Sequence, residues 1–394
     1  MNVYRSALLT SMTATGALLA AAMPTLALET EPFMEKLEAA MEADHTALTY
    51  GQARVEGDSI VLSDVTFDIT NGESYRFESM TFDGVSETDG GGYSVDQVRT
   101  PDIEIEREKV RVVVADITVD GLQIPATPST DPSDLDGQLL YERAHMGPIT
   151  VDHQEAQLLR ADEFVMDIAR KSETKGFDSM VRLEGIFLNL EAIEDPKARA
   201  ALDTLGYSTL TGRASINASW DMEAGDIELS DYTIDLNEVG QMSILIGLSG
   251  YTTEMAAQFE EIGARMTEAT EEADGQAMLA LLEQLTLNSA SIRFDDDGVT
   301  GKLLDYFGSQ QGVGGEEMAM AVSGMLPLFL GRLQNPAFQQ QVSTAVSAFL
   351  ADPQSLAIRA DPQEPLPLTT LFETGSTAPQ TLPDVLDVTV SAND

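Results

Sequence analysis

Side chains that commonly perform catalysis are scarce in this chain. The histidines are His45, His145 and His153, and cysteine is absent. His145 and His153 flank Gly147-Pro148 at a separation that does not place two metal ligands on one face of a helix. The sequence contains no HExxH, GxSxG, P-loop or dinucleotide-binding fingerprint. We therefore predict a protein that is not an enzyme and that has no catalytic residues, metal or cofactor.

One acidic segment does match a catalytic pattern. Asp295-Asp296-Asp297-Gly298-Val299 fits DxDx[TV] and resembles the nucleophile loop of haloacid dehalogenase-like phosphohydrolases. That resemblance implies an aspartate that attacks phosphorus and a Mg²⁺ held by acidic neighbours. However, the preceding Ile292-Arg293-Phe294 alternates in polarity, whereas a buried parallel strand would be continuously apolar. We interpret the segment as a polar turn between a strand and a helix, with Asp296 or Asp297 capping the helix.

A second acidic segment raises the question of calcium. Asp131, Asp134, Asp136, Gly137 and Glu142 lie close together in the sequence. The EF-hand spacing fails, because Gly137 at the sixth position would put Pro132 at the first and Arg143 at the twelfth. An ordinary acidic loop is our interpretation, and a loose, weak calcium site is the alternative.

The elements around these residues are predicted from a repeated pattern. Two alternating apolar residues, a polar or small pair, and a second alternating pair around a Thr recur in four segments: Ile60–Asp68, Tyr75–Asp83, Val112–Asp120 and Ile227–Asp235. The second pair falls on the opposite parity, so a straight strand would place the two pairs on opposite faces.

A bulge or bend at each polar pair would keep one buried face. The bends are expected at Ser63-Asp64, Glu78-Ser79, Ala115-Asp116 and Ser230-Asp231. The pattern therefore predicts a strongly curved antiparallel sheet. Two short strands joined by a tight turn at each place are the open alternative.

The organisation predicted along the chain is α+β, a large curved antiparallel sheet followed by a C-terminal helical region. We expect a signal peptide at 1–27, a β-rich region at 28–250 with a linker near 125–137, and a mainly helical region at 251–394 with two closing strands. The helices are predicted at 30–46, from Asp195-Pro196, and at 253–266, 277–285, 299–308, 316–333 and 336–351. The closing strands, near 356–359 and 385–390, flank a Pro-rich loop.

The N-terminus predicts export. Arg5 precedes an uncharged apolar run from Ala7 to Ala22, and Thr25-Leu26-Ala27 fits a cleavage site. A periplasmic protein with a cleaved signal peptide is the prediction, and a retained anchor is the alternative.

The charge is strongly negative. Lys and Arg number 22 against 66 Asp and Glu, giving a formal net charge of −44. Such a surface repels nucleic acid and anionic lipid headgroups, so nucleic acid is excluded as a partner. Adaptation to a salty medium and cation binding both remain possible explanations of the acidity.

The predicted helix at 316–333 is apolar nearly all round, which is typical of a buried helix. Methionine-rich surfaces can instead bind hydrophobic ligands adaptably. Met325, Leu328 and Phe329 are the residues that we assign to a hypothetical apolar groove on this basis.

The repeated strand pattern loosely resembles AsmA-like bacterial envelope proteins. The C-terminal part, with Gln310-Gln311-Gly312 and Asn335 to Gln341, resembles uncharacterised exported β-rich proteins of Gram-negative bacteria. These resemblances imply a non-enzymatic envelope protein, at most peripheral to a membrane, with a β-groove for a lipid or another hydrophobic ligand. A structural or assembly scaffold that binds an envelope protein through its acidic surface is the alternative.

Overall fold

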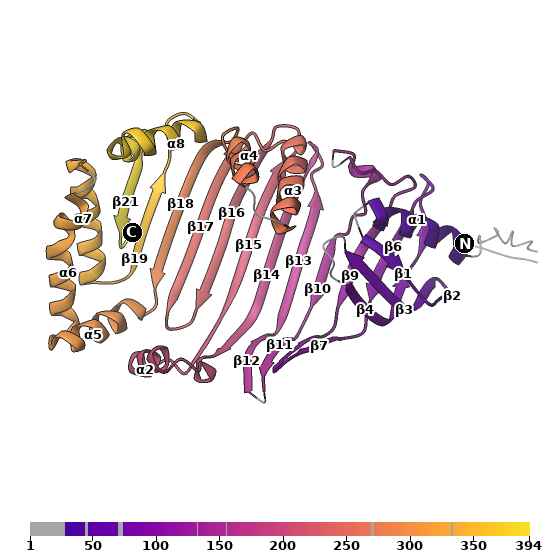
Figure 1. Cartoon of the computed structure of the whole chain (residues 1–394), viewed down its shortest axis with the longest axis horizontal. Coiled ribbons are helices and arrows are strands. Elements are labelled where there is room, and N and C mark those ends of the chain that lie inside the picture. The colour runs from indigo at the N-terminus through magenta and orange to yellow at the C-terminus, as the bar shows by residue number, and fades with distance from the viewer. Residues whose placement is uncertain are drawn as a thin grey trace, which may run out of the picture.

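The computed structural model describes residues 28–43, 46–69, 74–131, 133–154, 156–268, 272–331 and 334–394. The expected signal peptide at 1–27 and His45 lie outside the described residues. Figure 1 shows a long, open, curved sheet with helices at both ends and over one face. The predicted α+β class is confirmed.

The helices of the described residues include several at the C-terminal end. They are α1 (Thr30–Ala43), α2 (Pro196–Leu205), α3 (Thr253–Glu268), α4 (Glu272–Leu282), α5 (Val299–Gln311), α6 (Gly315–Leu330), α7 (Pro336–Ala351), α8 (Leu368–Thr377) and α9 (Leu382–Val385). Short 3-10 turns occupy Leu135–Gly137, Leu190–Ala192 and Pro379–Thr381.

The strands of the N-terminal half are β1 (Thr46–Thr49), β2 (Gln52–Glu56), β3 (Ser59–Ile69), β4 (Ser74–Asp83), β5 (Ser86–Glu87), β6 (Tyr93–Arg99), β7 (Ile103–Arg107), β8 (Val110–Val114), β9 (Thr118–Ile124), β10 (Arg143–Met146), β11 (Ile149–His153), β12 (Ala156–Ala161) and β13 (Glu163–Arg170). The remaining strands are β14 (Gly176–Asn189), β15 (Thr209–Asp221), β16 (Asp226–Leu236), β17 (Gly240–Ser249), β18 (Thr286–Asp296), β19 (Ser355–Ala360), β20 (Leu366–Pro367) and β21 (Val388–Ala392).

The sheet is antiparallel throughout its described pairings. Its main path of paired neighbours is β3, β4, β6, β9, β10, β13, β14, β15, β16, β17, β18, β19 and β21. A side branch of β7, β8, β11 and β12 joins the far end of β14. The sheet has no break at residue 250. Strand β17 ends at Ser249, and β18, β19 and β21 continue the same sheet after it.

Three of the four polar pairs of the repeat lie at a bend or a break of a strand, whereas at Glu78-Ser79 strand β4 runs on and pairs with β3 without a register shift. Asp64 has a φ of 53°, and Ile60 and Val65 on either side of it are both fully buried. Register shifts mark a bulge at the residues between Leu229 and Tyr232. At Ala115-Asp116 the chain leaves β8 and enters β9, and Asp116 has a φ of 48°. The chain therefore forms two short strands at this place, as in the alternative, but β8 and β9 pair with different neighbours and form no hairpin with each other. A bend within one strand is confirmed at Ser63-Asp64 and at Ser230-Asp231.

Capping residues set several helix starts. The Asp195 carboxylate accepts hydrogen bonds from the backbone N–H groups of Lys197 and Ala198, both at 2.8 Å, and Pro196 occupies the first helical position of α2. In α7 the Asn335 side chain accepts from Phe338 N at 3.1 Å, again ahead of a proline. Both starts are as predicted.

Two predictions near the C-terminus are wrong. The segment between the closing strands is not only a Pro-rich loop, because α8 and α9 lie within it. The last strand begins at Val388 and not near 385, since residues 382–385 form α9. Proline is favoured in the first turn of a helix as well as in loops, and Pro383 lies in the first turn of α9.

Candidate functional site

The most extensive feature of the sheet is a row of apolar side chains that crosses it from one end to the other. Each member lies directly opposite the next in the strand register, and we call the set the apolar row. Its members are Ile60, Phe82, Val98, Val119, Ala144, Met166, Val181, Ile216, Tyr232, Ile244, Ile292, Ile358 and Val390. Because paired residues in a sheet share a face, the whole row lies on one side.

Helices cover this face at its ends. At the N-terminal end the Phe33 ring of α1 contacts the Phe82 ring edge-on at a centroid distance of 5.3 Å, and both side chains are buried. At the C-terminal end Phe349 of α7 contacts Phe294 of β18 at 6.4 Å. Figure 1 shows α3 and α4 lying across the middle strands near one end of them. That pair encloses its own apolar cluster, with Leu248 of β17 packed against it.

Strand β17 shows that α3–α4 and α7 cover the same face. Its alternate residues Met242, Ile244, Ile246 and Leu248 share one side, with Leu248 packed against the α3–α4 cluster and Met242 paired with Phe294, which contacts α7. Between α3–α4 and α7 no described helix lies over this face. We call this part the open window and define it by Met242, Ile244, Ile292 and Ile358.

The open window exposes apolar side chains that a sheet usually covers. Ile292 is 50% exposed and Ile358 is 48% exposed, although β18 and β19 both have hydrogen-bonded neighbours on each side. Met242 is 40% exposed. A contiguous exposed apolar surface of this kind commonly marks a ligand or partner site.

The opposite face of the same strands is polar. Ser243, Arg293 and Ala357 pair across β17, β18 and β19, and Arg293 forms ion pairs with Asp295 at 2.7 Å and Asp394 at 3.0 Å. The two faces therefore differ sharply in chemistry. Within the described parts of β17, β18 and β19, the face of the apolar row carries the larger exposed apolar surface, and Leu245, 41% exposed, is on the opposite face.

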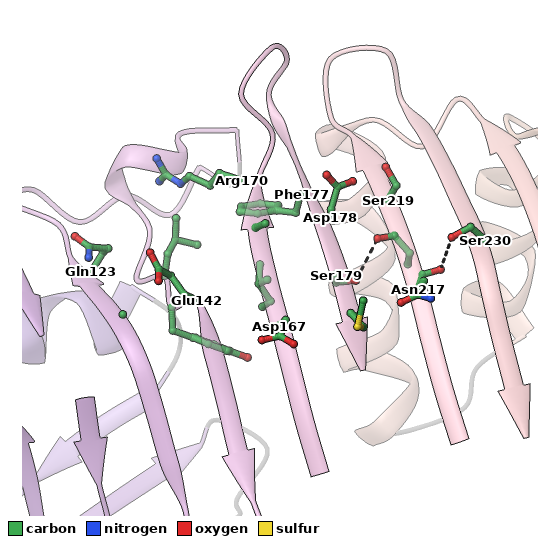
Figure 2. A pocket seen from close by; sticks show the side chains of 17 residues that line it. Gln123, Glu142, Asp167, Arg170, Phe177, Asp178, Ser179, Asn217, Ser219 and Ser230 are labelled. Carbon is green, nitrogen blue, oxygen red and sulfur yellow. Dashed lines mark hydrogen bonds between the residues drawn. The ribbon is translucent and has the colours of Figure 1, made fainter. Parts of the chain in front are cut away.

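A pocket of about 750 Å³ lies among β9, β10, β13, β14, β15 and β16 (Figure 2). Asp167, Met180 and Asn217 line it, and the register places these three on the face opposite to the apolar row. The lining residues labelled in Figure 2 are Gln123, Glu142, Asp167, Arg170, Phe177, Asp178, Ser179, Asn217, Ser219 and Ser230.

The polar groups of this pocket are mostly engaged with each other. Asp167 forms ion pairs with Arg143 at 2.6 Å and Arg182 at 3.4 Å. The Ser179 hydroxyl donates to Ala218 O at 3.5 Å and the Ser230 hydroxyl to Asn217 O at 3.3 Å, so neither contacts a general base.

Three further groups at the pocket are informative. Arg170 is paired with Asp136 at 2.9 Å, which fixes the predicted linker segment against β13. Burial raises the pKa of the Tyr141 phenol, so this side chain stays neutral at ordinary pH. Asn217 Oδ1 is buried and has no hydrogen-bond partner among the described residues. The lining of this pocket is mostly apolar, with Leu140, Ile168, Phe177 and Met180 among its residues.

The described histidines are separate from this pocket and from each other. His145 Nδ1 lies 3.1 Å from Asp116 O, and its Nε2 lies 3.3 Å from a Glu163 carboxylate oxygen. Both ring nitrogens therefore have protein partners. His153 lines a different, more open hollow together with Gln154 and Glu194.

The motif at Asp295 to Val299 forms the turn that we predicted. Asp296 accepts hydrogen bonds from Gly298 N at 2.8 Å and from Thr300 N at 2.9 Å, which caps the start of α5. Asp297 accepts from Glu238 N at 2.7 Å, and Asp295 is paired with Arg293. The three carboxylates thus have separate structural partners, and β18 is antiparallel to both of its long neighbours.

The acidic loop is likewise held together internally. Asp131 accepts from the backbone N–H of Ser133 at 2.9 Å and from its hydroxyl at 2.8 Å, and these bonds lower the pKa of the Asp131 carboxyl. Among the residues that the structure describes, no group of three or more His, Cys, Asp or Glu side chains is placed to hold a metal ion.

The residues that we assigned to a groove lie elsewhere. Met325, Leu328 and Phe329 are 45%, 77% and 65% exposed on α6, and none of them belongs to the apolar row. The prediction that this helix is buried all round is wrong, since only Met318 and Ala319 of α6 are buried. Helix α6 packs mainly against α5 and α7.

Sequence reasoning missed the open window. The alternation of apolar residues from Met242 to Leu248 was a usable signal, and so was the alternation of Ile292 and Phe294 around Arg293. Alternation identifies the apolar face of a strand, however, and does not say whether another element covers it.

Comparison with known proteins finds a match over the C-terminal part of the chain to a family model that names no activity. Residues 233–393 match the model of a family described as "Uncharacterized protein". This match begins within β16 and extends into the residue after β21, so it includes the open window and helices α3 to α9. A search of curated proteins found no match. In the described part of the chain, no helix has the length and hydrophobicity needed to span a bilayer.

Proposed function

We propose that this protein is a non-enzymatic binder of a ligand with one or more acyl chains, which lie along the apolar row. The open window is the observation that supports this most directly. Half-exposed isoleucines on two interior strands gain about 1 kcal/mol each when an apolar ligand covers them, because burial of a whole isoleucine contributes about 1.5–3 kcal/mol.

The dimensions of the surface suit such a ligand. From Met166 on β13 to Ile358 on β19 the apolar row crosses β14, β15, β16, β17 and β18. At an interstrand spacing of about 4.8 Å these steps cover roughly 29 Å. A bilayer hydrocarbon core of about 30 Å is two acyl chains thick, so one extended acyl chain would cover about half of this length.

The charge of the chain limits the headgroup. A formal net charge of −44 repels anionic lipids, so the ligand is expected to be neutral or zwitterionic. We further propose that the protein acts in the periplasm as an envelope protein, as its N-terminal residues and its resemblance to AsmA-like proteins suggest. Cofactors, metals and nucleic acid have no part in this function.

Native mass spectrometry of the mature protein, purified gently from periplasm, tests the proposal. We expect a stoichiometric lipid on the protein, or uptake of added phosphatidylcholine by the ligand-free protein. A clean mass with no uptake of phosphatidylcholine would refute ligand binding along the apolar row. A co-purifying protein in place of lipid would favour a scaffold that binds an envelope partner.

A further inference from the structure

The strongest feature outside the apolar row is an exposed hydrophobic surface on α5 and α6, at the C-terminal end of the sheet. We call it the end patch and define it by Leu303, Phe307, Met320, Met325, Leu328 and Phe329. The largest exposures are 77% for Leu328, 66% for Met320 and 65% for Phe329. Large apolar side chains this exposed on one pair of packed helices indicate an interaction site.

The α6 part of the end patch is uncharged within a strongly acidic chain, whereas on α5 the exposed Asp305 lies between Leu303 and Phe307 in the sequence. From Met318 to Leu330 there is no Asp, Glu, Lys or Arg, and the acidic residues of α6 are Glu316 and Glu317 in its first turn. The surrounding protein has a formal net charge of −44. An uncharged apolar surface in that setting suits a partner that is itself apolar and not negatively charged.

The charge selects among the possible occupants. A second copy of this chain would bring an equal negative charge into contact, and mutual repulsion opposes that association. An anionic membrane is opposed for the same reason. A zwitterionic phospholipid surface meets neither obstacle, and it accepts Met, Leu and Phe side chains at the boundary between headgroups and acyl chains.

The position of the end patch links it to the apolar row. Helix α6 packs on α7, and α7 packs on β21 and β19, the strands that contain Val390 and Ile358 at the end of the row. Figure 1 places α5, α6 and α7 together beyond this edge of the sheet. A membrane in contact with α6 would therefore lie next to the end of the apolar row and close to the open window.

We propose that the end patch docks this protein on a zwitterionic bilayer, so that acyl-chain ligands exchange between the bilayer and the open window. The docking step rests on the end patch alone, whereas the exchange step rests also on the proposed function. The two can be measured separately.

Flotation with phosphatidylcholine vesicles measures docking. We expect the wild-type protein to float with the vesicles and the double variant Leu328→Asn/Phe329→Asn to partition about tenfold less. The matched control Leu245→Asn/Ile105→Asn changes two exposed apolar residues on strands and should float like wild type. Met320→Asn provides a second, independent perturbation of the end patch.

The outcomes separate the hypotheses. Equal flotation of the wild type and both end-patch variants, or no flotation of the wild type, overturns docking. A concentration-dependent dimer of the wild type that Leu328→Asn/Phe329→Asn abolishes, without vesicle binding, overturns it in favour of self-association. Loss of binding to monomeric short-chain phosphatidylcholine by Ile358→Asp, with flotation intact, supports both steps. If wild-type protein floats but does not bind the monomeric lipid, docking stands and the proposed function fails.

Discussion

Ile358 gives the sharpest test of the open window. It is 48% exposed on β19 between β18 and β21, so an acyl chain lying over it would bury roughly the remaining half. Half of the value for a fully buried isoleucine is about 1 kcal/mol. Ile358→Ala should therefore weaken binding of a lipid about fivefold.

A charge at this position should have a larger effect. Ile358→Asp removes the same contact and also places a carboxylate under the acyl chain, which costs about 2 kcal/mol more when the chain displaces water. The sum of about 3 kcal/mol corresponds to roughly 100-fold weaker binding. The assay is a fluorescence titration with a short-chain fluorescent phosphatidylcholine kept below its micelle-forming concentration.

Leu245→Asp is the matched control. Leu245 is 41% exposed on the adjacent part of the sheet, but alternation places it on the face opposite to Ile244. The Leu245→Asp variant should bind the fluorescent phosphatidylcholine like wild type. If Leu245→Asp weakened binding as much as Ile358→Asp, the effect would be one of charge or folding. Binding by Ile358→Asp equal to wild type, with thermal unfolding unchanged, would refute the assignment of the open window.

Three predictions concern the scaffold. Phe33→Ala should lower the free energy of unfolding by about 3–5 kcal/mol in chemical denaturation, because Phe33 is fully buried against Phe82 and Tyr93; a loss below about 1 kcal/mol would contradict this packing. Asp195→Ala should cost about 1 kcal/mol, seen as a lower Tm, because two backbone donors of α2 lose their acceptor. Burial raises the pKa of Tyr141, so its contribution to stability is complete below the ordinary value of about 10 and is lost as the pH rises through the raised one. Tyr141→Phe should therefore lessen the loss of stability above a pH of about 10. An alkaline unfolding profile that the substitution leaves unchanged would argue against a contribution from Tyr141.

Local features of the structure were largely accessible from the sequence. A parity change at a polar pair is a local property, and Asp64, which tolerates a positive φ, supports the bend at Ser63-Asp64. Caps such as Asp195 depend on hydrogen bonds that span only a few residues. For the same reason the turn at Asp295 to Gly298 was predictable although it resembles a catalytic motif.

Only the tertiary structure decided which apolar surfaces other elements cover and how the strands align with one another. The apolar composition of α6 predicted a buried helix, yet whether Leu328 is buried depends on a neighbouring element that its own sequence does not specify. The apolar row depends on the alignment of many strand pairs, and a shift of one residue in any of them would move the following members to the other face. The sequence determined which residues are apolar and where strands bend. Packing against α1, α3, α4 and α7 decided that Ile60 lies in a core and that Ile292 faces solvent, because burial is a property of the neighbours of a residue.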